Sequence, residues 1–316
     1  MRAACEGAYE ASGLWITGRF PTGGASSHSS IGSLDPMPAA EAKEVVLEGI
    51  HKSFGDKPVL QGVDLSIPPG QLMAIVGGSG CGKTVLLKLV MAHYPPDAGR
   101  VLVADHEADP GADGAAPLQD LSTLDEAGMD RIRTHWSIVF QRNALVTGDV
   151  FENLAILPRE VKGMSDEAIM PLARKALVDV GLDPDAVMHR DREELSGGMA
   201  KRVAVARALV MDPVVVMYDE PTAGLDPEMS AQIAGLIGAS HRAQPGMAAT
   251  RPGIRRTSVV VTHDTGLLQR LRPRIVMLHA GRVHFDGAFE AFAASDDPHI
   301  RPYRAQMGLL HLNGAQ

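Results

Sequence analysis

The residues best suited to chemistry in this 316-residue chain form a glycine-rich run after a short apolar stretch. Residues 77–84 read Gly-Gly-Ser-Gly-Cys-Gly-Lys-Thr and follow the apolar residues 72–76. Glycines let backbone N–H groups curl around a phosphate without Cβ clashes, and a following helix adds its positive dipole end. Lys83 would reach the β- and γ-phosphates, and the Thr84 hydroxyl would ligate Mg²⁺. The run predicts a phosphate-binding loop, in preference to a glycine-rich turn that happens to carry a lysine.

An acidic pair forms the second candidate. Asp219 and Glu220 end the apolar run at 214–218, and the carboxyl ends of buried strands are where α/β sheets bind ligands. Asp219 is predicted to hold Mg²⁺ through water, and Glu220 to polarise the attacking water. An acidic pair alone is as often a solvated loop, but a phosphate loop in the same chain favours the catalytic interpretation.

A third candidate opens a predicted helix. Ser196, Gly197 and Gly198 precede residues 200–210, and a serine with two glycines at a helix start is another anion cradle. Taken alone, an ordinary helix cap is the simpler interpretation. A chain with one phosphate loop has no need of a second cradle, unless that cradle serves the nucleotide of another subunit.

Composition excludes several classes of protein. The chain is 45% hydrophobic and 22% charged, as in ordinary globular proteins. Its net charge of -8 argues against a nucleic-acid partner, because phosphate contacts need clustered Lys and Arg. No stretch reaches the length of about 18 apolar residues that a membrane span needs. Two cysteines, Cys5 and Cys81, fit a reducing compartment.

The elements that must position these candidates alternate between strands and helices. Apolar runs predict strands at 45–47, 63–67, 72–76, 214–218 and 258–262, with a closing hairpin around Gly281. The stretch 143–205 is predicted to be mainly helical, and residues 104–128 to be a loose acidic surface loop. Residues 1–42 lack periodicity and are predicted to be a disordered leader. This alternation indicates an α/β fold with a mostly parallel sheet.

These motifs together resemble the ATP-binding subunits of ABC transporters over residues 45–287. Residues 77–84 match Walker A, Gln141 the Q-loop, 195–199 the signature with Met199 in place of Gln, and 214–219 Walker B. Asp226 matches the D-loop and His263 the switch histidine. The resemblance implies a P-loop NTPase domain over 43–290, with a mostly parallel core sheet, N-terminal antiparallel strands and a helical subdomain at about 143–205.

The resemblance also implies ATP and Mg²⁺ as cofactors and a role for each matching residue. It implies catalytic roles for Glu220, His263 and Gln141, and Mg²⁺ ligation by Thr84, Gln141 and Asp219. It implies that the nucleotide is contacted by Phe54, Gly77, Gly78, Ser79, Gly80, Cys81, Gly82, Lys83 and Thr84, and by Ser196, Gly197, Gly198 and Asp226.

The implied partners are a second copy of the chain, packed head to tail, and a separate integral membrane permease. Residues 140–145, 150–160 and 294–301, with Met199, are similar to the Mla/Mce branch, which transports phospholipid and other hydrophobic compounds. That branch implies an MCE-domain lipid-binding protein and a small regulatory subunit as further partners. It also implies a cytoplasmic subunit held on the inner face of the cell membrane by the permease. Two alternatives stay open: an importer of polar small solutes, and a soluble ABC ATPase without a permease.

The C-terminal tail, residues 291–316, keeps apolar residues that an exposed extension would not normally keep. They are Ile300, Tyr303, Met307, Leu309 and Leu310. We expect the tail to pack against the second subunit or a regulatory protein, or else against the core of its own subunit.

Overall fold

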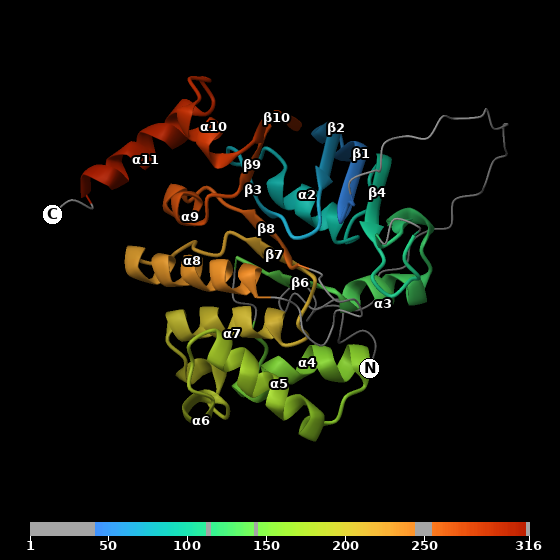
Figure 1. Cartoon of the computed structure of the whole chain (residues 1–316), viewed down its shortest axis with the longest axis vertical. Helices are drawn as coiled ribbons and strands as arrows, with labels where there is room; N and C mark the ends of the chain where they lie inside the picture. Colours follow the sequence, from blue (N-terminus) through green and yellow to red (C-terminus); the bar gives the residue numbers. More distant parts are fainter. Residues whose placement is uncertain (1–41, 112–114, 142–144, 244–254, 314–316) are drawn as a thin grey trace.

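The computed structural model describes residues 42–111, 115–141, 145–243 and 255–313, with side chains as far as residue 308. The predicted leader lies outside the described residues, except for its last residue. The described chain forms two sheets, with helices at the sides (Figure 1). No helix in these ranges is long and apolar enough to cross a membrane.

A six-stranded sheet forms the centre of the molecule, in the order β10-β9-β3-β8-β7-β6. Its strands are β3 (Leu72–Val76), β6 (Trp136–Val139), β7 (Val215–Asp219), β8 (Thr257–Val261), β9 (Arg274–His279) and β10 (Arg282–Gly287). All neighbouring strands pair in parallel except β10, which turns back on β9 at Gly281. The predicted mostly parallel sheet and closing hairpin are therefore confirmed.

An antiparallel sheet of four strands packs against this centre, in the order β2-β1-β4-β5. Its strands are β1 (Val45–Phe54), β2 (Lys57–Ile67), β4 (Ala98–Ala104) and β5 (Leu118–Asp120). Apolar residues of β1, β2 and β4 share one core cluster with helix α2 (Lys83–Val90). Helix α2 thus packs between the two sheets. The predicted N-terminal antiparallel strands are present in this sheet.

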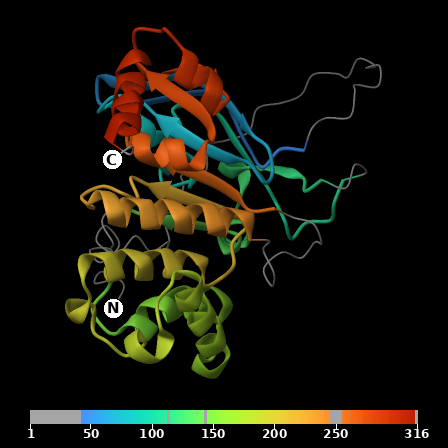
Figure 2. The same ribbon diagram turned by 60° about the vertical axis from the view of Figure 1, so that its left-hand side comes forward.

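A group of helices covers the opposite face of the six-stranded sheet, as both views show (Figures 1 and 2). They are α4 (Val150–Lys162), α5 (Asp166–Asp179), α6 (Pro184–Val187), α7 (Gly197–Leu209) and α8 (Pro227–Arg242). Their apolar residues share a second core cluster with Val216 and Tyr218 of β7. Asp149 caps the start of α4, because its side chain accepts a hydrogen bond from the Glu152 N–H (2.7 Å). The predicted helical stretch is thereby present, and α7 extends it to Leu209.

The C-terminal tail packs, as far as its side chains are described, on its own subunit. Helices α9 (Thr265–Leu271), α10 (Phe289–Ala294) and α11 (Arg301–Asn313) lie together in both views. Ile300 and Met307 are buried in a third cluster with Ala74 and Val76 of β3. Of the alternatives given above, these residues therefore follow packing against the core of their own subunit. The side chains of Leu309 and Leu310 lie outside the described part.

The predicted loose loop at 104–128 is wrong in part. It contains β5, the 3-10 turn η1 (Leu121–Thr123) and the start of α3 (Glu126–Thr134). Asp105, expected on the surface, is buried. Its carboxylate accepts hydrogen bonds from the N–H groups of Glu107 (3.0 Å) and Ala108 (3.2 Å) and lies 3.5 Å from Arg131. Such a local aspartate turn has the composition of an exposed loop, which explains the error.

A buried polar cluster lies where this segment meets the start of β6. His106 bonds to the buried Glu44 (2.7 Å), and its ring centroid is 5.8 Å from that of His135. His135 Nε2 lies 3.2 Å from a Glu107 oxygen, and Lys162 of α4 lies 3.6 Å from the same oxygen. Burial, followed by the neighbouring His106, lowers the pKa of His135, although Glu107 acts in the opposite direction.

This lowered pKa predicts a loss of stability in acid. Below about pH 6.5 the unfolded chain binds a proton at His135 that the folded chain resists, so the free energy of unfolding falls as the pH drops. We expect His135→Gln to lose less stability than the wild type between pH 7 and pH 5. Urea unfolding at both pH values measures this, with His51→Gln at an exposed position as the control. Equal losses in wild type and His135→Gln would contradict the assignment.

Candidate nucleotide-hydrolysis site

Four parallel strands end at one edge of the six-stranded sheet, and a predicted site residue follows each. Gly77 follows β3, Gln141 follows β6 after one residue, Asp219 ends β7, and His263 follows β8 after one residue. The carboxyl ends of parallel strands share an edge, so the sheet itself brings these residues together.

The phosphate loop runs from Gly77 into helix α2. Gly82 precedes the helix with a φ of +104°, and a Cβ there would lie 2.7 Å from the Leu60 side chain, so the position requires glycine. Gly78, Ser79 and Gly80 are exposed. Lys83 Nζ donates to the carbonyls of Gly77 (2.8 Å) and Gly78 (3.1 Å). The ammonium therefore lies over the loop, where a bound phosphate could replace the carbonyls as its acceptor.

Asp219 has the properties of a magnesium-site residue. Its side chain is buried, and Oδ1 is a buried atom without a hydrogen-bond partner. Burial raises the pKa of the Asp219 carboxyl, as does the nearby Glu220, whereas Lys88, Lys83 and Lys201 lower it. An unpartnered carboxylate oxygen in such surroundings fits a divalent cation, which would favour the ionised form of Asp219. Thr84, exposed in the first turn of α2, and Gln141 would complete the predicted protein ligands.

Glu220 and His263 meet across the ends of β7 and β8. His263 Nδ1 lies 2.9 Å from Glu220 Oε1, and the His263 N–H points to Oε2 at 3.4 Å. The Glu220 side chain is largely buried, whereas that of His263 is 70% exposed. Glu220 adopts a φ of +47°, a conformation that non-glycine residues rarely hold and that clusters at functional sites. The pair can orient a water molecule for attack on a phosphate placed in the loop.

Lys201 was not among the predicted site residues, yet it lies close to two of them, Gln141 and Asp219. This lysine of α7 is only 2% exposed, and its Nζ donates to the carbonyls of Phe140 (3.2 Å) and Gln141 (3.1 Å). Burial lowers the pKa of the Lys201 ammonium to about 8, and the charge of Asp219 opposes this shift. No local pattern marks this role, because the partners of Lys201 lie 61 and 60 residues away in the sequence.

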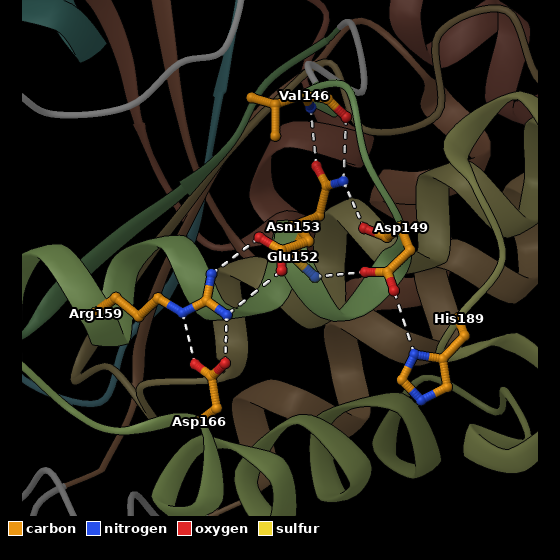
Figure 3. Close-up of polar contacts among 7 residues, drawn as sticks. All are labelled: Val146, Asp149, Glu152, Asn153, Arg159, Asp166 and His189. Carbon is orange, nitrogen blue, oxygen red and sulfur yellow. Dashed lines mark hydrogen bonds and ion pairs between the residues drawn. The ribbon is translucent and has the colours of Figure 1, made fainter.

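The segment that follows residues 142–144 is fixed to α4 (Figure 3). The buried Asn153 accepts from the Val146 N–H (2.8 Å) and donates to the carbonyls of Val146 (3.1 Å) and Asp149 (2.9 Å). Arg159 of α4 pairs with Glu152 of the same helix and with Asp166 at the start of α5. The bonds of Asn153 hold the segment from Val146 to Asp149 against α4 of the helical subdomain.

The remaining predicted residues lie apart from this cluster. Ser196 caps α7 through the Met199 N–H (3.2 Å), and Asp226 caps α8 through the Met229 N–H (2.8 Å). In the described part of the chain no hydrogen bond links either residue to the phosphate loop. Phe54 is 45% exposed, with its ring 5.5 Å from that of Tyr94. Gly197 is exposed and Gly198 half-buried beside Met229.

A phosphate loop, a buried acidic strand end and an adjoining Glu–His pair define a nucleoside-triphosphate hydrolase. The family model described as "ABC transporter" matches residues 60–223. The chain is 36% identical to Protein TRIGALACTOSYLDIACYLGLYCEROL 3, chloroplastic, of Arabidopsis thaliana, over 80% of this chain and 71% of the relative. It is 35% identical to the L-cystine transport system ATP-binding protein TcyN of Escherichia coli K12, over 84% of this chain and 97% of that protein.

Solved structures give the same assignment. The dimeric bacterial ABC transporter cassette MJ0796 superposes with a TM-score of 0.62 at 27% identity, over 78% of this chain and 98% of the cassette. A second structure of that cassette is a post-hydrolysis state bound to ADP and Pi, with a TM-score of 0.60 at 28% identity. The chain belongs to the ABC transporter family, as an ATP-binding subunit with ATPase activity that uses ATP and Mg²⁺.

The first prediction from this geometry concerns Glu220. Glu220→Gln should lower ATP turnover by at least about 100-fold, because the water-orienting carboxylate is lost, while MgATP binding persists through the loop and Asp219. Steady-state hydrolysis and equilibrium nucleotide binding measure the two effects, and the variant should accumulate an ATP-filled dimer. As the matched control, Lys83→Ala should lose nucleotide affinity itself. Wild-type turnover in Glu220→Gln would remove Glu220 from this role.

The second prediction concerns Cys81. A Cβ placed on Gly77 would lie 2.6 Å from the Cys81 Sγ, and Cys81 packs against the core below the loop. Its side chain is partly exposed, and MgATP bound to the loop amides should cover it and slow maleimide labelling. A Cys5→Ser background leaves Cys81 as the single thiol, and mass spectrometry follows the modification. Equal rates with and without MgATP would contradict this placement.

Proposed function

We propose that two copies of this chain form a head-to-tail dimer that drives a separate membrane permease. Ser196 and Gly197 are exposed at the start of α7, and within the described ranges they make no hydrogen bond to their own phosphate loop, so their N–H groups are available to a nucleotide bound by a second copy. The dimeric MJ0796 cassette supports this arrangement. The permease would hold the subunit at the membrane, since no helix in the described ranges could span one.

The proposed contact with the permease lies beside Gln141. Lys201 ties the Gln141 carbonyl to α7, and Asn153 ties the segment from Val146 to Asp149 to α4 (Figure 3). A movement of the helical subdomain against the sheet would therefore be transmitted to the backbone beside Gln141, and from there to a permease helix.

The proposed cargo is a phospholipid or another hydrophobic compound, with an MCE-domain protein and a small regulatory subunit as further partners. The observation that carries this proposal is the resemblance of residues 140–160 to the Mla/Mce branch. Within this segment, Val146 is bonded to Asn153 of α4. Met199 and the 294–301 segment agree with it, and the Arabidopsis relative bears the name of a galactolipid.

Import of a polar amino acid is the second candidate. It is supported by TcyN and by the histidine transport ATP-binding protein HisP of Pseudomonas aeruginosa, which is 34% identical over 82% of this chain and 96% of its own length. Identities of 36% and 35% do not separate the two cargo classes, so the cargo must be measured.

The deciding experiment is to purify the chain together with its permease from membranes. For the lipid transporter we expect bound phospholipid by mass spectrometry, and ATPase activity that changes with added phospholipid but not with cystine or histidine. The Glu220→Gln complex controls for contaminating ATPases. Stimulation by a polar amino acid, with no bound phospholipid, would favour the importer, and failure to recover any integral membrane partner would favour an ATPase that works without a permease.

A further inference from the structure

We propose that Tyr303 is a positioning residue of the phosphate loop, through which the C-terminal helix α11 sets the affinity for the nucleotide. The Tyr303 hydroxyl accepts a hydrogen bond from the backbone N–H of Gly77, at 3.1 Å, across 226 residues of sequence. Gly77 is the first residue of the loop, and Tyr303 lies beyond the family match at 60–223. The inference does not depend on which compound is transported.

The apolar face of α11 holds Tyr303 in place. Ile300, Tyr303 and Met307 recur at helical spacing and pack in the cluster that contains Ala74 and Val76 of β3, the strand that leads into the loop. The Tyr303 ring meets Phe292 edge to face, with centroids 5.7 Å apart. On the neighbouring helix, Gln269 Nε2 donates to the Met307 carbonyl (3.1 Å). The hydroxyl thus reaches Gly77 from a ring that is packed against this cluster.

The bond falls at the residue where the loop is most constrained. Gly77 has a φ of +148°, and a Cβ there would lie 2.4 Å from the Leu278 carbonyl oxygen. Its own carbonyl accepts from Lys83 Nζ. Lys83 must give up this carbonyl to reach a phosphate, so Tyr303 keeps the junction of β3 and the loop in place during the exchange. Burial raises the pKa of Tyr303, which keeps the hydroxyl neutral.

This role predicts an effect on binding rather than on the hydrolysis step. Among the described residues, the Tyr303 hydroxyl bonds to Gly77 and makes no hydrogen bond to Glu220, His263 or Asp219, so the turnover number should change little once the site is saturated. Loss of one hydrogen bond that orders the loop should weaken MgATP binding by about fivefold. A partner that displaced α11 would have the same effect, which would make the tail a route for control of the ATPase.

The test compares two variants. Tyr303→Phe removes only the Tyr303 hydroxyl, whereas Met307→Leu alters the packing of α11 and leaves the Tyr303 hydroxyl in place. For Tyr303→Phe in the full chain we expect a Kd and KM for MgATP raised about fivefold, kcat within about twofold and faster hydrogen exchange at the Gly77 amide without nucleotide. For Met307→Leu we expect wild-type values of all three.

Two outcomes would overturn the proposal. The first is wild-type affinity together with wild-type Gly77 exchange in Tyr303→Phe, which would show that the hydroxyl does not hold the loop. The second is the same loss of affinity in Met307→Leu as in Tyr303→Phe, which would show that helix packing alone is responsible. Hydrogen exchange needs no activity, so it reports on the bond even if a variant hydrolyses ATP poorly.

Discussion

The parallel pairing of β3, β6, β7 and β8 is the constraint on which the site depends. The paired residues at the strand ends are Ile75 with Val261, Asp219 with Val261, and Val139 with Tyr218. Because these ends lie level, the residues that follow emerge side by side. A slip of one residue in any strand would turn its side chains to the other face of the sheet, and the acidic end of β7 would no longer face the phosphate loop.

Charge buried behind this edge prepares it for a metal and a phosphate. An isolated buried charge is costly, yet Asp219 and Lys201 both lie close to the end of β7. Lys201 is compensated by two backbone carbonyls, whereas Asp219 retains an unpartnered oxygen. The fold therefore holds these polar groups in place before any ligand arrives, which lowers the reorganisation needed in the transition state.

The features that could be predicted from the sequence are those that a short, local stretch of residues specifies. The apolar run of β3 and the glycines after it describe strand and loop without reference to the rest of the chain, and the acidic end of β7 is equally local. Asp105 was misplaced because an aspartate turn has the composition of a surface loop. Lys201 and Tyr303 were missed as site residues for a different reason. Their roles rest on contacts across 60 and 226 residues, which no periodicity reveals.

The contact between Glu220 and His263 depends on the order of the strands in the sheet rather than on the conformation of a loop. Each residue leaves the sheet from one of two adjacent parallel strands, and the Glu220 N–H remains bonded to the Val261 carbonyl (2.8 Å). This bond holds Glu220 at its positive φ, a conformation that costs about 1–3 kcal/mol. Pairing with the sheet offsets this cost. The Glu220 carboxylate would therefore keep its direction while Lys83 leaves the Gly77 carbonyl for a phosphate. Lys83, which must move, follows β3, whereas Glu220, which must stay fixed, follows β7 at the same edge of the sheet.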